Sequence, residues 1–137
     1  SMTTKPETKF WRRIKNKFTK ITFTRIEAVT PTGLPDLNGI FVDLEKKPHE
    51  FWVELKVSSG NQVKLSPSQI SWHMHRFKLG AKSIIMAKTL PRRGIALYSG
   101  GRSLNLATYG LNLEPCAFYP EPCAWQELES GLMKLAS

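Results

Sequence analysis

Apolar residues recur at helical spacing near the start of the chain and alternate further along it, so the hydrophobic pattern divides the sequence into elements. Residues 7–20 place large apolar side chains on one face and basic residues mostly on the other, which predicts an amphipathic helix. The apolar face consists of Phe10, Trp11, Ile14 and Phe18. Residues 21–29 alternate and are rich in β-forming residues, which predicts a strand, and the Pro- and Gly-containing residues 30–35 predict a loop.

Two further strands are expected over residues 36–44 and 50–57, which are rich in apolar and aromatic residues. The charged residues 45–49 between them contain a proline and predict a hairpin connection. These two strands should therefore lie side by side.

The start of a second helix is indicated by three residues at their preferred positions. Ser66 is suited to the N-cap, Pro67 to the first helical position, and Gln69 to the third, where it completes a capping box. We expect this helix to run to about Leu79, with Gly80 as its left-handed stop.

The rest of the chain completes the predicted sheet. A short apolar run at residues 83–88 predicts a strand that is buried on both faces. The later elements are a strand at residues 94–98, an edge segment at 104–109, an irregular stretch at 111–122 and a short amphipathic helix at 125–135. The order α-β-β-β-α-β implies an α/β fold with a mixed β-sheet flanked by α-helices.

The length of 137 residues and the hydrophobic content of 41% predict one folded domain over residues 1–137. Its expected parts are a basic N-terminal helix at about 7–20, a core at about 21–110, and a Pro-rich segment with a short C-terminal helix at 111–137. No stretch approaches the ~20 apolar residues of a membrane helix, and no apolar block follows the early charges as in a signal peptide. We therefore expect a cytoplasmic protein with no membrane partner.

The excess of positive charge is concentrated near the N-terminus. The net charge is +9; residues 1–25 hold eight Lys/Arg and one Glu, a net of +7, and the 12 basic and 10 acidic residues that follow add only +2. A polyanion is the natural partner of such a segment, because each neutralised phosphate releases condensed counterions. A solvated helix face is an alternative of similar weight, and a membrane surface is a weaker one because the segment has few aromatic residues.

The cysteines and histidines do not indicate a metal site. Cys116 and Cys123 lack a second pair of ligands, and we expect both to be reduced. His49, His73 and His75 do not combine with them at a metal-ligand spacing.

Acidic and basic residues that suit phosphodiester hydrolysis gather around the hairpin. Asp36 follows a Pro-stiffened loop, and Glu54 and Lys56 are two positions apart on a strand, so their side chains point to one face. Neighbouring strands lie ~4.8 Å apart, so Asp36 meets Glu54 if the two strands pair in a suitable register. The pattern predicts two carboxylates and an amine in one place.

Such a group of side chains can serve hydrolysis. Paired carboxylates bind Mg²⁺, which lowers the pKa of a bound water and polarises a phosphate, and an amine offsets the developing negative charge. The competing interpretation is a solvent-facing charge pair on a half-buried strand, as is common for Glu-x-Lys. The apolar residues around Glu54 and Lys56 favour a functional pair, because charges in a sheet core persist when they are paired or hold a metal.

Three motifs follow one another within residues 25–88. They are Gly33-x-Pro35-Asp36, Val53-Glu54-Leu55-Lys56 and Leu65-Ser66-Pro67-x-Gln69-x-x-Trp72. Together they resemble the PD-(D/E)XK nuclease superfamily and, within it, the VRR-NUC domains and phage-type Holliday-junction resolvases. The resemblance implies a restriction-endonuclease-like fold with an αβββαβ core, dependence on Mg²⁺ or Mn²⁺, and cleavage of DNA.

The resemblance also implies roles for individual residues. Asp36 and Glu54 would be metal ligands, the Leu55 carbonyl a third ligand, and Lys56 the catalytic amine. The family often supplies an extra acid from the first helix, and Glu27 is the best match here, although it can also form a surface ion pair with Arg25.

Gln69 resembles a family glutamine that lines the site. The same residue suits the capping box of the second helix. Both roles are compatible, but we expect them to use different side-chain contacts. Further along this helix, Trp72 is expected in the core, and His73 or Arg76 is expected to reach phosphate.

The function expected from charge and resemblance together is a metal-dependent DNA endonuclease acting on branched DNA, in recombination or repair. The expected DNA-binding residues are Arg12, Arg13, Lys15, Lys17, Lys20, Arg25, Lys64, His73 and Arg76. The alternatives are a less selective nuclease on flap or duplex DNA and a binding module without catalysis. A compact nuclease of this size suits a phage, which would place it in the host cytoplasm.

Cutting both strands of a junction symmetrically needs two active sites, so a homodimer is expected. Two apolar regions are candidates for its interface. They are the helix face with Phe10, Trp11 and Phe18, and the Pro-rich segment with Phe118 and Tyr119.

Overall fold

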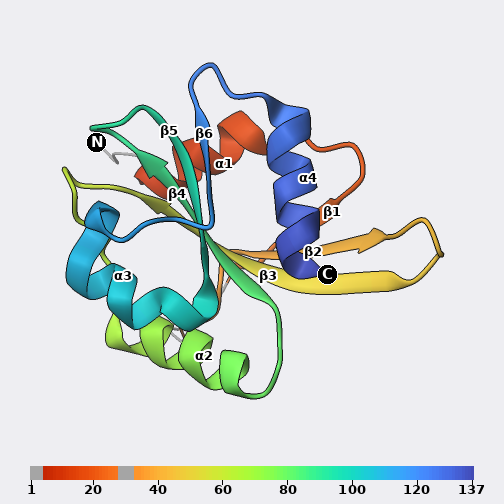
Figure 1. Cartoon of the computed structure of the whole chain (residues 1–137), viewed down its shortest axis with the longest axis horizontal. Helices are drawn as coiled ribbons and strands as arrows, with labels where there is room; N and C mark the ends of the chain where they lie inside the picture. The colour runs from red at the N-terminus through yellow and green to blue at the C-terminus, as the bar shows by residue number, and fades with distance from the viewer. Residues whose placement is uncertain (1–4, 28–32) are drawn as a thin grey trace.

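A mixed β-sheet forms the centre of the structure, a computed structural model that describes residues 5–27 and 33–137 (Figure 1). Within these residues the sheet has six strands in sequential order. They are β1 (Thr22–Arg25), β2 (Leu37–Val42), β3 (Pro48–Val57), β4 (Ser83–Thr89), β5 (Gly94–Ser99) and β6 (Ala117–Pro120). The β3–β4 pair is parallel and every other neighbouring pair is antiparallel.

Helices cover both faces of the sheet. They are α1 (Pro6–Ile14), α2 (Pro67–Lys78), α3 (Ser103–Tyr109) and α4 (Trp125–Ala136), with short 3₁₀ turns η1 (Gly100–Arg102) and η2 (Gly110–Asn112) on either side of α3. Figure 1 shows α2 and α3 together on one side, and α1 and α4 together on the other. The predicted mixed sheet flanked by helices is confirmed, and the segment from α1 to β4 has the predicted α-β-β-β-α-β order.

The two faces of the sheet have different interiors. On the side of α1 and α4, apolar residues such as Phe51, Val53 and Leu55 of β3 pack against Ile14 and Leu132 in the larger core. On the other side, a smaller apolar cluster lies under α3. Because strand side chains alternate, Glu54 and Lys56 point to this second side, away from the larger core.

Helix α2 begins where the sequence predicts. Ser66 is the N-cap and accepts a hydrogen bond from the Gln69 backbone N–H, Pro67 is the first helical residue, and Gly80 has a φ of 86° after the last turn. Local capping chemistry therefore determines both ends of this helix.

The predicted N-terminal helix over 7–20 is too long, because α1 ends at Ile14. The next segment turns so that the backbone N–H groups of Thr19, Lys20 and Ile21 donate to the buried Glu129 carboxylate of α4, at 2.9, 2.9 and 3.1 Å. These tertiary bonds replace the helical ones.

The apolar face of α1 is not open to a second subunit. Phe10 is 3% exposed, and Trp11 and Phe18 pack against the larger core, which corrects their assignment to a dimer interface. Phe118 and Tyr119 of β6 are half-buried against the same sheet. The described helices of residues 5–27 and 33–137 include none that is long and apolar enough to span a membrane.

Two further expectations are wrong near the C-terminus. Residues 104–109 belong to helix α3 rather than to an edge strand, and this helix buries Leu106 while Leu104 stays 53% exposed. Residues 117–120, expected to be irregular, form β6 by pairing with β5.

The strand predicted over residues 21–29 is shorter in the structure, because β1 ends at Arg25. Its last two positions and residues 30–32 of the predicted loop lie outside the described residues.

Candidate active site

A cleft opens where β1 and β2 stop and β3 continues. The pairing of β2 with β3 begins at Leu37 opposite Val53, so the residue before Leu37 falls beside Glu54, and β3 extends past it to Val57. The cleft has a volume of about 520 Å³. It is lined by the start of α1, the end of β1, residues 33–36, the end of β3 and the first turn of α2.

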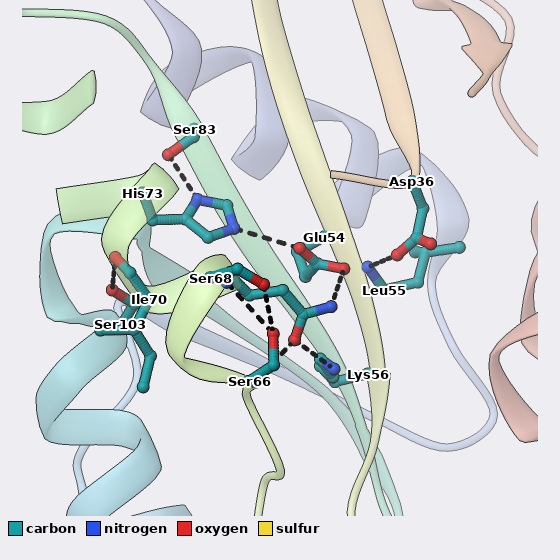
Figure 2. A network of polar contacts seen from close by, with 11 residues as sticks. Asp36, Glu54, Leu55, Lys56, Ser66, Ser68, Ile70, His73, Ser83 and Ser103 are labelled. Atoms are coloured by element: carbon teal, nitrogen blue, oxygen red, sulfur yellow. Dashed lines mark hydrogen bonds and ion pairs between the residues drawn. The ribbon is translucent and has the colours of Figure 1, made fainter. Parts of the chain in front are cut away.

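The loop before β2 lies tightly against α2. Gly33 has a φ of 76°, and a Cβ built on it would lie 2.3 Å from the Ser68 carbonyl oxygen, so glycine is required by both backbone conformation and space. This contact places Asp36 at the mouth of the cleft. Its Oδ2 accepts a hydrogen bond from the Leu55 backbone N–H at 2.7 Å (Figure 2).

Asp36, Glu54 and Lys56 all line this one cleft, as the strand pattern predicts. Glu54 is 2% exposed, and its pKa is raised to about 9 by burial first and then by the charge and hydrogen bond of the Asp36 carboxylate. The Lys56 ammonium lowers the same pKa without cancelling these effects. The two acid groups therefore face each other, and Glu54 keeps its proton near pH 7.

Gln69 joins the first turn of α2 to both charged residues of β3. Its Nε2 donates to Glu54 Oε2 at 3.3 Å, and its Oε1 accepts from Lys56 Nζ at 3.0 Å. The same Oε1 accepts from the Ser66 backbone N–H at 2.9 Å, which completes the capping box. We expected Gln69 to use different side-chain contacts for capping α2 and for lining the site. This expectation is wrong, because Oε1 of Gln69 accepts from both the Ser66 backbone N–H and Lys56 Nζ.

His73 is the main partner of Glu54 that the sequence analysis missed. Its Nε2 lies 3.3 Å from Glu54 Oε1, and its Nδ1 lies 2.9 Å from the Ser83 hydroxyl, as Figure 2 shows. His73 is completely buried, and its pKa is lowered to about 4 by burial first and by the Lys56 charge second. The imidazole is therefore neutral near pH 7, and its contact with Glu54 is a hydrogen bond rather than an ion pair.

The burial of His73 corrects its assignment to DNA binding, because a side chain with no exposed surface does not reach a phosphate. Its spacing from Gln69, four positions along a helix, places both side chains on one face and was the signal available in the sequence. Gly100 packs directly against the hydrogen-bonded Ser83 and His73 side chains. A Cβ on Gly100 would lie 1.9 Å from Ser83 Oγ and 3.0 Å from His73 Nδ1.

Two further acids line the cleft. Glu27 is exposed in the segment after β1 and is not on a helix, unlike the extra acid implied by the family resemblance. Glu7, in the first turn of α1, lines the same cleft and contributes to raising the pKa of Glu54. The available signal was that Glu7 is the only acid of the predicted first helix.

Arg25 is the expected DNA-binding residue that the structure places in the cleft. Its Nη2 donates to Thr8 Oγ1 at 3.4 Å. Its Nη1 is buried and has no hydrogen-bond partner within residues 5–27 and 33–137. Lys5 also lines this side of the cleft. An anionic group entering here would meet the positive charges of Arg25 and Lys5.

The other expected DNA-binding residues lie outside the cleft and are exposed. They are Arg12, Arg13, Lys15, Lys17, Lys20, Lys64 and Arg76. Arg13 lies 3.6 Å from Glu121, and Lys17 lies over the Trp125 ring at 5.6 Å from its centroid. Trp72 is half-buried on α2 rather than in the core.

The donor set fits a hard divalent cation. Across the described parts of the chain, no three His, Cys, Asp or Glu side chains converge into a complete metal cage. Mg²⁺ does not require one, because it usually takes one or two carboxylates and keeps water and phosphate oxygens for the rest. The facing carboxylates of Asp36 and Glu54, with the raised Glu54 pKa, are an arrangement that a cation would relieve.

No protein-family profile matches the sequence, and no curated protein matches it. Among solved structures, the chain is similar to Hjc, a Holliday junction resolvase from the archaeal hyperthermophile Archaeoglobus fulgidus. The TM-score is 0.45 and the sequence identity 16%, over 68% of this chain and 72% of that one.

Proposed function

We propose that this protein is a metal-dependent endonuclease that hydrolyses phosphodiester bonds in DNA. The observation that carries the proposal is the pair of facing carboxylates, Asp36 and Glu54, with Lys56 beside them in one cleft. A buried acid whose pKa is raised by burial and by a neighbouring acid is typical of a functional site. Such a pair of acids does not stabilise the folded state, so its presence suggests a role in function. The net charge of +9 supports a polyanionic substrate.

Asp36, Glu54 and the Leu55 carbonyl would hold Mg²⁺, with Mn²⁺ as a substitute. Bound there, the cation would lower the pKa of a water and polarise the phosphate. Lys56 is positioned by Gln69, which takes one of its three donors at 3.0 Å, so the ammonium is held at the cleft with donors left for a phosphate oxygen. Its charge would stabilise the negative charge that develops on the phosphate during hydrolysis.

The acids at the edge of the cleft have supporting roles in this proposal. Glu27 and Glu7 both line the cleft and are candidates for positioning water or a second cation. Arg25, which lines the cleft, would supply positive charge for a phosphate group bound there. His73 orients Glu54 from behind and does not contact substrate.

We further propose that the substrate is branched DNA such as a four-way junction, and that the active form is a homodimer. The motif resemblance to junction resolvases supports this choice. A chain of this size has little room for base-reading elements, which favours recognition of backbone and shape. Two symmetric cuts require two sites, hence two copies of the chain.

The test is cleavage of labelled DNA of three kinds: a four-way junction, a flap and a linear duplex of equal length. Wild-type protein should cut the junction fastest and only with Mg²⁺ or Mn²⁺. Lys56→Ala should abolish cutting while binding in EDTA persists; Lys134→Ala, which removes the same charge from the exposed end of α4, is the matched control. Equal rates on all three substrates would indicate the less selective nuclease, and binding without any metal-dependent cutting would indicate a non-catalytic module.

A further inference from the structure

A second hollow lies on the outer side of α2, next to the cleft. It has a volume of about 320 Å³ and is lined by Ser68, Ser71, Trp72, His75 and Arg76. Ser68 also lines the cleft, so the two hollows share a rim. Arg76 is exposed, and its guanidinium lies over the Trp72 ring at 4.6 Å from the centroid.

A second tryptophan extends this surface onto the sheet. The Trp52 and Trp72 rings meet edge to face, with centroids 5.7 Å apart, and both residues are half-buried. Trp52 is two positions before Glu54 and points to the same face of β3, about 6.6 Å along the strand. That separation is about two steps of the 3.4 Å rise between bases on one DNA strand.

The segment that contains α2 carries positive formal charge only. Residues 64–82 contain four basic residues and no Asp or Glu. The basic residues are Lys64, Arg76, Lys78 and Lys82. An aromatic surface in a positive field, within reach of the cleft, suits a nucleotide: the base stacks on the rings and the phosphate meets the cations.

We propose that Trp72, Trp52 and Arg76 form a binding site for an unpaired nucleotide of the DNA substrate. A base within a duplex is stacked on both faces and has none to offer a tryptophan, so this site selects DNA in which a base is unpaired or unstacked. The base stacks on Trp72 in place of the Arg76 guanidinium, which turns to the adjoining phosphate. The inference rests on the proposed function, because it names the kind of DNA that the cleft receives.

The experiment measures affinity in EDTA, so that cutting does not interfere. The probes are a short blunt duplex and the same duplex with a single-stranded thymine extension. Trp72→Ala should lower the preference for the extended probe about tenfold and leave affinity for the blunt duplex within about twofold. Trp72→Tyr should keep most of the preference, because tyrosine also stacks. Tyr109→Ala removes a 59% exposed aromatic from α3 and should change neither affinity.

A measurement on the wild-type protein covers the case in which Trp72→Ala does not fold. With 2-aminopurine in the extension, stacking should quench its fluorescence on binding, and Arg76→Ala, a change at an exposed residue, should weaken binding of the extended probe. The proposal is overturned if the fluorescence does not change, or if Trp72→Ala lowers both affinities equally or neither. It is also overturned if Trp72→Ala changes the sedimentation of DNA-free protein, which would make this surface a contact between two copies of the chain.

The two proposals fail in different ways. If the wild-type protein prefers the extended probe but cuts nothing with Mg²⁺, the nucleotide site stands and the nuclease proposal falls. If it cuts DNA with Mg²⁺ and Trp72→Ala leaves the preference unchanged, the nuclease proposal stands and the nucleotide site falls.

Discussion

Within residues 5–27 and 33–137 two glutamates are buried, and their surroundings differ in kind. Glu129 on α4 is 4% exposed and accepts hydrogen bonds from three consecutive backbone N–H groups, the closest at 2.9 Å. Glu54 on β3 is 2% exposed; its two side-chain partners, Gln69 and His73, both lie at 3.3 Å, and it faces the Asp36 carboxylate.

The difference contrasts a buried acid whose burial the fold compensates with one whose burial it does not compensate. The Glu129 carboxylate receives fixed donors and ties the segment after α1 to α4, so its burial is compensated by the fold. The Glu54 carboxylate is buried beside another acid, which the fold alone does not compensate. A cation between Asp36 and Glu54 would supply what is missing.

The largest effect is expected on turnover. Glu54→Gln should lower the rate of Mg²⁺-dependent cleavage by about 10³-fold or more, since it removes a proposed metal ligand next to the reacting phosphate. Glu129→Gln should leave the rate per folded molecule almost unchanged. The measurement is single-turnover cleavage of a labelled junction, with the folded fraction determined by circular dichroism. A similar loss in both variants would contradict the distinction between the two acids.

Stability should respond in the opposite way. Glu129→Ala leaves three backbone donors without their acceptor and should lower the free energy of unfolding by about 3 kcal/mol or more. Glu54→Gln in EDTA should leave the free energy of unfolding unchanged or raise it, because at pH 7 the folded protein keeps the Glu54 proton, with a pKa of about 9, while the unfolded chain gains by losing it. Urea unfolding of both variants measures this. A destabilised Glu54→Gln in EDTA would show that the Glu54 carboxylate is structurally compensated after all.

The dependence of stability on pH should reveal Glu54 and His73 separately. The Glu54 pKa is about 9 in the folded protein and 4.5 ordinarily, so the folded state holds this proton more tightly and loses stability as pH rises from about 4.5 to about 9. The His73 pKa is about 4 against 6.5, so stability is lost as pH falls from about 6.5 to about 4. Because the two effects oppose each other between about pH 4.5 and 6.5, urea unfolding in EDTA should show a fall in stability from about pH 6.5 to about 9 and a shorter loss below about pH 4.5.

Each slope should disappear with its own residue. Glu54→Gln should flatten the alkaline side and keep the acid side, and His73→Asn should do the reverse. In the wild-type protein, Mg²⁺ bound at Glu54 would compete with the Glu54 proton, so its binding should tighten as pH rises and should release a proton near pH 7. Calorimetry in buffers of different ionisation enthalpy measures that proton. No proton release would mean that the cation binds elsewhere.

A smaller effect is expected from the residues behind Glu54. His73→Asn should weaken Mg²⁺ binding about tenfold, because partners that orient a ligand typically contribute this much. Ser83→Ala should have a weaker effect in the same direction, since Ser83 acts through His73 at 2.9 Å. Ser99→Ala, which removes a hydroxyl that caps η1, is the matched control and should not change Mg²⁺ binding. An equal effect of all three changes would indicate a general loss of packing.

The elements that the sequence predicts correctly depend on local chemistry. Ser66, Pro67 and Gln69 determine the start of α2 through contacts within a few residues. The meeting of Asp36 with Glu54 follows from a short hairpin whose register places Leu37 opposite Val53. In both cases the interacting groups are close along the chain, so the sequence pattern alone predicts that they meet.

The wrong or missed elements depend on distant partners. Strand β6 forms because it pairs with the edge of β5. The chain after α1 turns away from a helical course where Glu129, more than 100 positions away, accepts the N–H groups of Thr19, Lys20 and Ile21. His73 meets Ser83 only after α2 packs on the sheet. A pattern of hydrophobicity does not contain these contacts, because they join side chains whose positions are set by the whole fold.

The most direct test of the central claim is anomalous diffraction at the manganese edge from crystals of the protein soaked in Mn²⁺. We predict a peak between the Asp36 and Glu54 carboxylates, at a bonding distance of roughly 2.0–2.2 Å, that is absent in Glu54→Gln. A cleft without a peak under the conditions in which the protein cuts DNA, or a peak only at other residues, would contradict the assignment of these two acids as the metal site.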